Sequence, residues 1–352
     1  MRLKIIALFT GLVTVLLCVI SGLQINPINP AALLQTSTPA PGRPGGFGNA
    51  TLPPTVTQPP AAAETATPVA TPTDSGPSIS GPFVIYAVGD IARCLGSSPA
   101  QGSGAEITSD MLLNTSGPIF TLGDNSNDKG TQADYANCYN PTWGRLLDRT
   151  YPVMGNHDRG MDSEGADYFA YFAGRTGVWG HYSLDLGAWH IVVLNTQCGI
   201  GGQLCRTGSP QEQWLKADLA ATRQKCIMAL WHQPVFTSGR EPPFPTAKSF
   251  WMDLYAAKAD IILNGHNHLY ERFFPLDPNG NVAADGMREF VVGTGGAGLQ
   301  PPVLPPLSSE MVRDATSFGY LKLSLFEDSY KWKFVPQPGK SFTDSGSANC
   351  HR

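Results

Sequence analysis

Seven side chains that could bind a metal or transfer a proton follow short apolar runs in this sequence. They are Asp90, Asp124, Asn156, His157, His232, His266 and His268. Carboxylate and amide oxygens together with imidazole nitrogens suit Zn²⁺, Mn²⁺ or Fe, and the set contains no thiolate. A single Gly-Asp pair or a single histidine has an ordinary structural explanation. Five such motifs, each directly behind an apolar run, predict a metal centre.

The apolar runs that precede these side chains predict buried strands. They are Phe83–Val88, Pro118–Leu122, Tyr151–Met154, Cys226–Trp231 and Ile261–Leu263. Helical candidates lie between several of them, at Ser109–Leu113, Gln132–Leu147, Pro210–Ala221 and Ala247–Lys258. Strand, crossover helix and strand imply parallel pairing. Because functional groups collect beyond the carboxyl ends of such strands, the motifs are expected to meet there.

Other stretches alternate apolar and polar residues and suggest antiparallel pairing at the sheet edges. They are His181–Leu186, His190–Asn195, Glu289–Gly293, Tyr320–Phe326 and Tyr330–Val335. Two mixed sheets packed face to face, with helices outside them, satisfy both patterns. Residues 83–352 are enough for one large domain with a substantial core.

The overall composition excludes two other classes of protein. The chain has 352 residues, a formal net charge of −4, 42% apolar residues and 15% charged residues. A polybasic nucleic-acid binder would carry an excess of positive charge, and a fully disordered chain would have fewer apolar residues. No nucleic-acid binding is expected.

The N-terminal residues predict export. Residues 1–23 begin with Arg2 and Lys4 and continue uncharged from Ile5 to Leu23, as in a signal peptide that is removed or an anchor that is retained. Residues 24–82 hold 13 of the 30 prolines, with few charges or aromatic residues, and predict a disordered linker. We therefore expect a secreted protein, or one tethered to the outer face of the cell membrane through residues 5–23.

The number of cysteines also favours export to an oxidising compartment. Apart from Cys18, six cysteines remain, and in an exported protein an even number favours disulfides over metal ligation. The glycine-rich segment between Cys198 and Cys205 could close a small ring. The other expected pairs are Cys94 with Cys138 and Cys226 with Cys350.

With these motifs in place, the sequence resembles the calcineurin-like metallophosphoesterase superfamily, and within it the purple-acid-phosphatase-like branch. The resemblance covers roughly residues 83–336. It also includes Tyr139-Asn140-Pro141-Thr142-Trp143-Gly144, Gln211-Glu212-Gln213-Trp214-Leu215, His268-Leu269-Tyr270-Glu271-Arg272 and Val292-Gly293-Thr294-Gly295-Gly296-Ala297. The fold that the resemblance implies is an α/β fold, a four-layer α/β/β/α sandwich of two mixed sheets.

The resemblance also implies a role for each candidate residue. Asp90 and His268 would bind one metal ion, Asn156, His232 and His266 the other, and Asp124 would bridge the two. His157 would stand beside the substrate phosphate as a proton donor or positive contact, and Asp158 could orient it.

One position departs from the branch. Purple phosphatases usually place a tyrosine three residues after the bridging aspartate, and its phenolate binds ferric iron. Here that residue is Asn127, and Ala92 stands where many members of the superfamily have a further histidine. An amide is a weak ferric ligand, so we expect two divalent ions and no purple colour.

The sequence as a whole predicts an exported, dinuclear-metal-dependent hydrolase of small phosphate esters, in which a metal-activated hydroxide attacks and His157 assists. A phosphomonoesterase is the first choice. A phosphodiesterase on the same site, or a non-catalytic metal-binding protein at the cell surface, are the alternatives. We expect His181 and His190 to be surface or packing residues, and Arg272 to contact a phosphate, Glu271 or another carboxylate.

Overall fold

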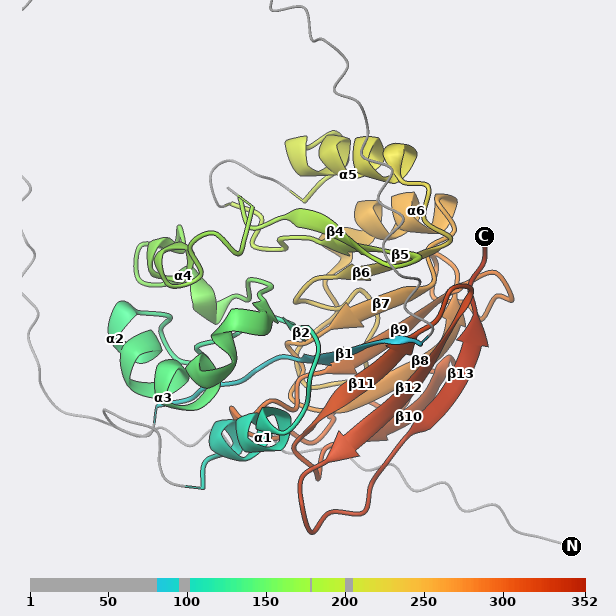
Figure 1. Ribbon diagram of the computed structural model, residues 1–352. Coiled ribbons are helices and arrows are strands. Elements are labelled where there is room, and N and C mark those ends of the chain that lie inside the picture. Colours follow the sequence, from blue (N-terminus) through green and yellow to red (C-terminus); the bar gives the residue numbers. More distant parts are fainter. Residues whose placement is uncertain (1–80, 95–101, 178, 200–204) are drawn as a thin grey trace, which may run out of the picture. The chain divides into compact units, whose positions relative to one another are not determined.

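Two β-sheets packed face to face form the centre of the described part of the chain (Figure 1). The computed structural model describes residues 81–94, 102–177, 179–199 and 205–352. The predicted signal or anchor at 1–23 and residues 24–80 of the predicted linker lie outside the described residues. The expectation of an α/β fold with two mixed sheets and outer helices is confirmed.

The first sheet has six strands in the order β13-β12-β11-β1-β2-β3. Their bounds are β13 (Ser345–Asn349), β12 (Ser329–Pro336), β11 (Gly319–Leu325), β1 (Phe83–Val88), β2 (Ile119–Thr121) and β3 (Thr150–Tyr151). β1, β2 and β3 run parallel to one another, while the pairs β1–β11, β11–β12 and β12–β13 are antiparallel. The three motif-bearing strands of this sheet therefore end at one edge.

The second sheet has seven strands in the order β10-β8-β9-β7-β6-β5-β4. Their bounds are β10 (Glu310–Asp314), β8 (Tyr270–Leu276), β9 (Met287–Val292), β7 (Ile261–Asn264), β6 (Cys226–Leu230), β5 (Trp189–Val193) and β4 (Tyr182–Leu186). β5, β6, β7 and β9 are parallel, and the remaining pairs are antiparallel.

Helices and helical turns connect these strands. They are α1 (Gly104–Leu113), α2 (Gln132–Asp134), the π-helix η1 (Tyr135–Tyr139), α3 (Asn140–Thr142), α4 (Ala166–Tyr171), α5 (Pro210–Ala221), α6 (Lys248–Ala256) and the 3₁₀ turns η2 (Trp143–Arg149), η3 (His157–Arg159) and η5 (Pro245–Ala247). Helix α5 has the predicted bounds, because Ser209 caps its first turn by accepting a hydrogen bond from Glu212 N.

Alternate residues of the buried strands serve two hydrophobic cores. On β6, Met228 and Leu230 belong to the core between the sheets, whereas Ile227 and Ala229 belong to the core that includes α5 and α6. A strand that buries both faces has no polar side and appears as an unbroken apolar run. This double burial explains why these strands were visible in the sequence.

All three expected disulfides are present. Cys94 pairs with Cys138, Cys198 with Cys205 and Cys226 with Cys350. The last pair joins the start of β6 to the C-terminal residues, across 124 positions of the sequence.

The helix expected at Gln132–Leu147 is confirmed as a continuous helical run, but the run is irregular. It passes from α2 through the π-helix η1 and α3 to the 3₁₀ turn η2. Pro141 within it has no N–H to donate, which favours an irregular hydrogen-bond pattern.

The antiparallel pairing expected for the stretches at β5 and β9 is present on one side of each strand, with β4 and with β8. The expected edge position is wrong, because each strand also pairs in parallel on its other side, with β6 and with β7. Alternation reports which side chains are buried, and it does not report strand direction.

Glu289 on β9 makes stability depend on pH. It is fully buried, and burial, followed by the nearby Glu271 charge, raises its pKa well above the ordinary 4.5. The unfolded chain ionises above pH 4.5 while the folded chain keeps the proton, so stability is full below that pH and falls as pH rises toward the raised pKa. The expected slope is up to about 1.4 kcal/mol per pH unit.

Replacing the carboxyl group tests this dependence. Glu289→Gln should remove the slope, so that the variant gains stability relative to the wild type between about pH 5 and about pH 8 in urea unfolding. Glu327→Gln is the control, because the Glu327 side chain is 76% exposed. Parallel curves for the wild type and Glu289→Gln would refute the assignment.

Candidate metal centre

The six candidate ligands follow strands whose carboxyl ends meet. Asp90 follows β1, Asp124 follows β2, Asn156 follows β3, His232 follows β6, and His266 and His268 follow β7. β1 to β3 are parallel in one sheet, and β6 and β7 are parallel in the other. Five loops that are far apart in the sequence therefore contribute to one site.

Asp90 joins the β1 loop to the β7 loop. Its side chain is fully buried, and Oδ2 accepts a hydrogen bond of 2.8 Å from His266 N. Oδ1 lies 3.3 Å from Nε2 of His268 but accepts no well-aligned hydrogen bond. His268 directs Nε2 inward because Nδ1 lies 2.7 Å from the Gly298 carbonyl oxygen. A buried carboxylate oxygen without a donor is what a bound cation would satisfy.

Asp124 lies between several of the loops. Oδ1 accepts a hydrogen bond of 2.8 Å from His157 N and lies 3.4 Å from Nε2 of His232. Oδ2 accepts a hydrogen bond of 3.0 Å from the Asn127 amide. Its two oxygens thus face different sides of the site, as a bridging carboxylate requires.

His232 is fixed by a carbonyl group, as metal-binding histidines usually are. Nδ1 lies 2.7 Å from the Leu122 carbonyl oxygen, so Nε2 is the nitrogen that faces the site, 3.0 Å from Oδ1 of Asn156. The rings of His232 and His266 have their centroids 5.0 Å apart.

The donor atoms converge closely enough to bind cations. One ligand atom each from Asp90, Asp124 and His232 lies within 4.8 Å of the other two, and all three residues are buried. The mixed oxygen and nitrogen donors suit Zn²⁺, Mn²⁺ or Fe. The residues present therefore fit the metal ions that the sequence predicts.

Charge interactions couple these side chains in the metal-free chain. Burial opposes ionisation of Asp124 most strongly, but the charges of His232 and His157 and their hydrogen bonds together outweigh it and lower the carboxyl pKa to about 2. Burial would lower the His232 pKa, whereas the Asp124 charge raises it to about 9. Burial, and then the His232 charge, lowers the His266 pKa to about 4. A metal ion must displace the proton from His232, so binding is expected to release protons.

Several residues of the site have strained backbone conformations, and the glycines of the motifs leave room for the ligand side chains. Asp90, Asp124 and His266 all have positive φ, at 60°, 50° and 70°, which non-glycine residues rarely adopt. A Cβ on Gly155 would lie 2.1 Å from Asp124 Oδ1, and one on Gly123 would lie 2.3 Å from Nδ1 of His232. These glycines are needed because the ligand side chains occupy the adjacent space.

Asp158 does not orient His157, contrary to expectation. Its buried carboxylate accepts hydrogen bonds from the backbone N–H groups of Asn125, Ser126 and Gly155, from the Asn125 amide and from the Tyr135 hydroxyl. It therefore ties the β2 loop to the β3 loop. His157 is oriented instead by the backbone carbonyl of Asp128, 2.6 Å from Nδ1.

Asn267 is a residue that the sequence analysis missed. It lies between His266 and His268, is fully buried, and donates to Oγ1 of Thr237 and to the Glu241 carbonyl, each at 3.1 Å. Its own Oδ1 accepts a hydrogen bond of 2.7 Å from Glu241 N. Asn267 thus fixes the loop after β6 against the β7 loop. Its central place in Gly-His-Asn-His was the only signal.

A cleft of about 720 Å³ opens over these side chains. It is lined by Arg93, Cys94, Asp124, Asn127, Asp128, Lys129, Asp134, Asn156, His157, Glu241, His266, His268 and Gln300. Four of the six candidate ligands and His157 therefore face open space, while Asp90 and His232 are fully buried behind them. A small charged ester could reach the centre through this cleft.

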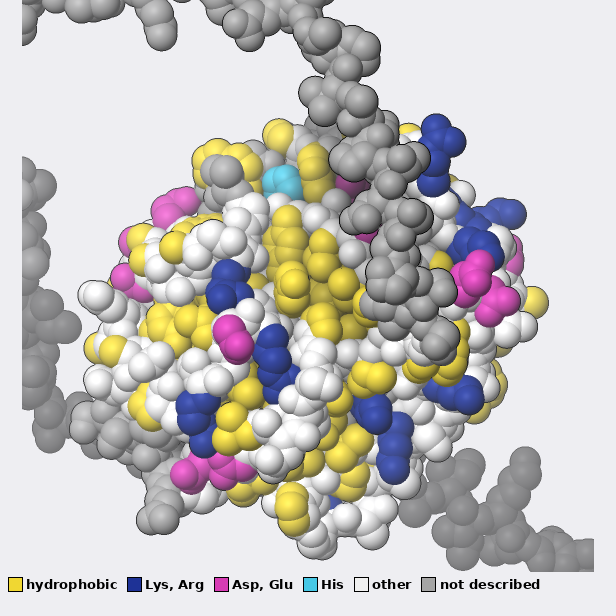
Figure 2. All heavy atoms as spheres, in the orientation of Figure 1, with side chains coloured by type: hydrophobic (Ala, Val, Ile, Leu, Met, Phe, Trp, Pro, Cys, Tyr) yellow, Lys and Arg dark blue, Asp and Glu magenta, His cyan; other side chains and the backbone are white. Residues whose placement is uncertain are grey.

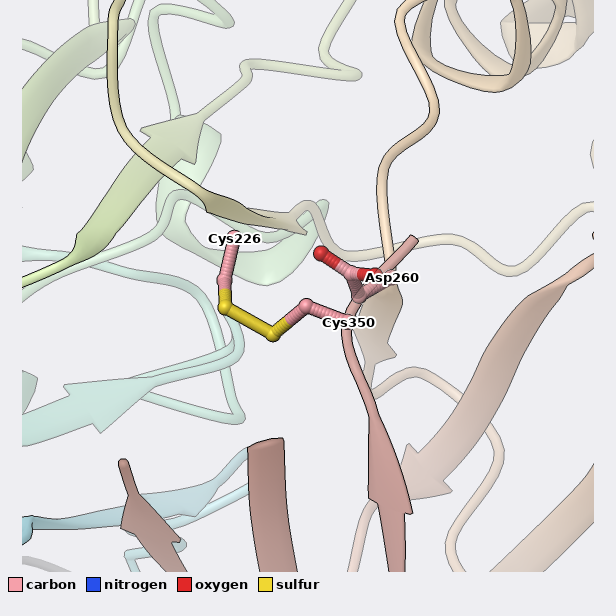
Figure 3. A group of neighbouring side chains, drawn as sticks. All are labelled: Cys226, Asp260 and Cys350. Carbon is pink, nitrogen blue, oxygen red and sulfur yellow. A yellow bond between two sulfur atoms is a disulfide. The ribbon is translucent and has the colours of Figure 1, made fainter. Parts of the chain in front are cut away.

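Two further groups of acidic and sulfur side chains do not form metal sites. Cys226, Asp260 and Cys350 lie together, but Figure 3 shows the two sulfur atoms bonded to each other. Cys94 lies near Asp128 and Asp134 and is bonded to Cys138. Sulfur atoms in a disulfide are not thiolates and do not ligate a metal ion.

The two histidines expected to be structural have neighbours outside the cleft. His190 is buried on β5, with Nδ1 2.8 Å from Asp185 and Nε2 2.9 Å from Asp218. The His181 ring packs on Trp214, with centroids 4.6 Å apart. Neither ring lines the cleft described above.

Comparison with known proteins assigns the family. Residues 83–270 match the family described as calcineurin-like phosphoesterase, which is more than half of the chain. The chain belongs to this family. The expected resemblance to its purple-acid-phosphatase-like branch is also confirmed.

Curated relatives come from that branch. Purple acid phosphatase 15 of Arabidopsis thaliana is 28% identical over 265 residues, covering 63% of this chain and 46% of that protein. Purple acid phosphatase 21 of the same plant is 27% identical over 227 residues, covering 55% and 49%. The chain thus spans about half the length of these curated relatives.

Solved structures share the fold. Purple acid phosphatase PPD1 from yellow lupin seeds has a TM-score of 0.61 at 20% identity, covering 76% of this chain and 53% of that one. GAP50, described as the anchor in the inner membrane complex of Plasmodium, has a TM-score of 0.56 at 15% identity, covering 77% and 90%. Both likenesses support the two-sheet sandwich.

Proposed function

We propose that residues 83–352 form the catalytic domain of a dinuclear-metal-dependent phosphomonoesterase. The observation that carries the proposal is the convergence of two carboxylates, one amide and three imidazoles at the carboxyl ends of strands from both sheets, beneath an open cleft. The family assignment supports a phosphate ester as the substrate class.

Each ligand has a role in this proposal. Asp90 and His268 hold one cation, Asn156, His232 and His266 hold the second, and Asp124 bridges the two. When bound, two divalent cations supply Lewis acidity, which lowers the pKa of a water molecule and neutralises charge on the phosphate. Because only two ligands are anionic, the loaded site keeps a net positive charge that attracts a phosphate ester.

His157 is proposed to assist the leaving group. Its side chain is 41% exposed and lines the cleft, and Nε2 lies 3.9 Å from Oδ2 of Asp124. Nδ1 donates to the Asp128 carbonyl oxygen, so Nε2 faces the cleft, and the imidazolium form of His157 would donate its Nε2 proton to the ester oxygen and remain as the neutral ring. Its exposure lets it contact a bound phosphate.

Hydrolysis of an ester panel tests the proposal. The purified chain, freed of metal and then supplied with Zn²⁺, Mn²⁺ or Fe²⁺, should hydrolyse an aryl phosphate monoester faster than the matching diester. Faster diester hydrolysis would make the protein a phosphodiesterase. If neither ester is hydrolysed with any of these metals, although metal analysis shows two bound ions, the protein has a metal-binding role without turnover.

The colour of the iron-loaded protein is a separate prediction. The amide of Asn127 donates to Asp124, at the position where the branch places its tyrosine. Without a phenolate ligand there is no phenolate-to-iron charge transfer, so the protein loaded with iron in air should be nearly colourless. An intense visible absorption band would contradict this expectation.

Export and tethering belong to the proposal as well. We place a signal or anchor at residues 1–23 and a spacer at 24–82, so that the domain acts outside the cell. Three disulfides support an oxidising compartment. Within the described part of the chain, every helix is too short or too polar to span a bilayer.

A further inference from the structure

On strands β11, β12 and β13 of the first sheet, no helix of the described residues covers the outer face (Figure 1). On β11, β12 and β13, side chains alternate between the core and this outer face. Tyr330, Trp332 and Phe334 point into the core and are buried, whereas Lys331 and Lys333 are exposed. In Figure 1 no labelled helix lies in front of these three strands. The sheet itself is therefore the surface here.

Three lysines lie side by side on this face. Lys322 on β11 is directly opposite Lys333 on β12, and Lys331 is opposite Ser324. They surround a shallow hollow of about 440 Å³, which is lined by Lys322, Ser324, Lys331, Trp332, Lys333, Ser345, Gly346 and Ser347. We call this set the lysine face. Figure 2 shows dark blue side chains gathered over these strands.

Repulsion among the three lysines destabilises this part of the sheet when no partner is bound. Like charges directly opposite each other on a sheet destabilise the pairing. None of the residues that line the hollow, all within the described part of the chain, is acidic. Serine hydroxyls on the neighbouring strand add hydrogen-bond donors. A bound anionic partner would offset this repulsion.

We propose that the lysine face docks on the anionic headgroups of a lipid bilayer. The face is a sheet surface of one charge sign, which matches a flat layer of phosphate groups better than a groove would. Each lysine near an anionic membrane raises affinity by about fivefold, so three give about a hundredfold. Alone this is weak, but a tether supplies a high effective concentration. The inference therefore rests on the proposed tether at residues 5–23.

Hydrogen exchange on vesicles tests the docking. The full chain is reconstituted on vesicles of phosphatidylcholine alone, or with about three parts in ten of phosphatidylglycerol, at about 50 mM salt. Exchange of the β13 amides should slow at least about threefold on the anionic vesicles only, since β13 is an edge strand of this face. Raising the salt to about 500 mM should remove the difference.

Charge-removing variants make the test specific. The triple variant Lys322→Gln, Lys331→Gln and Lys333→Gln should lose the slowing, while Lys225→Gln, Lys248→Gln and Lys258→Gln, with the same charge loss elsewhere, should keep it. Both variants should retain ester hydrolysis in solution, which separates this inference from the proposed function. Equal exchange on both vesicles would overturn the docking. If soluble polyphosphate slows exchange of the β13 amides and anionic vesicles do not, the lysine face binds a soluble polyanion and the membrane docking is overturned.

Discussion

Replacing Asp124 by alanine is expected to lower metal-dependent ester hydrolysis by at least about 10³-fold and to reduce the bound metal from two ions to at most one per chain. Asp124 is the carboxylate whose two oxygens face different sides of the site, toward His232 and toward Asn127. Removing it takes away the bridge, and it also leaves the His157 N–H without its acceptor. Elemental analysis and initial rates measure the two effects separately.

The matched control is Asp110→Ala, because Asp110 is exposed and forms a surface ion pair with Arg145. Metal content and turnover should stay at wild-type levels in this variant. A thermal shift on adding metal gives a third readout, since a cation that binds only the folded chain stabilises it. That shift should shrink in Asp124→Ala. An Asp124→Ala protein with two tightly bound ions and normal turnover would exclude the bridging role.

The second large effect concerns stability, and it lies at Asp344. This carboxylate is only 8% exposed and accepts hydrogen bonds from Nε and Nη2 of Arg272, at 2.6 and 2.8 Å. The Tyr270 hydroxyl and the Trp332 indole donate to it as well, at 2.7 and 3.0 Å. Asp344→Ala leaves the buried Arg272 charge without its carboxylate partner, so we expect a loss of about 3–5 kcal/mol in the free energy of unfolding.

Urea unfolding of the oxidised protein measures this loss. Lys225→Gln is the control, because the pair Lys225–Glu327 is exposed and should contribute at most about 1 kcal/mol. The double variant Arg272→Met, Asp344→Leu removes both charges and should recover much of the stability. If Asp344→Ala and Lys225→Gln lose equal stability, the buried pair has no special energetic role.

Elements that are local and strongly patterned were predictable. The strand at Phe83–Val88 and the helix at Pro210–Ala221 have the predicted bounds. Double burial makes such a strand an apolar run, and a serine cap followed by proline marks the helix start. The strands β8, β10 and β13 were not predicted. β8 is buried at most positions, and β13 has no large apolar residue, so neither shows the alternation of apolar and polar residues that marks a strand. β10 pairs with β8, with β9 lying between them in the sequence.

The candidate site divides in the same way. The types of its donor atoms could be taken from the motifs, since each motif is continuous and follows a strand. The contacts between different motifs could not be predicted from the sequence. Asp158 was expected to orient the adjacent His157, but it ties the β2 and β3 loops together. For Arg272 several partners were open, and the structure selects Asp344, which is 72 positions away.

By itself, then, the sequence determined the chemistry available to this protein: oxygen and nitrogen donors at strand ends, a neutral amide at Asn127 and paired cysteines. Residue type and short-range periodicity are properties of a few neighbouring positions, so they can be identified without coordinates. The tertiary structure decided which donors converge, which histidine nitrogen faces the site and which sheet face stays uncovered. Those features depend on the packing of distant segments, where burial and hydrogen-bond satisfaction select one arrangement among many.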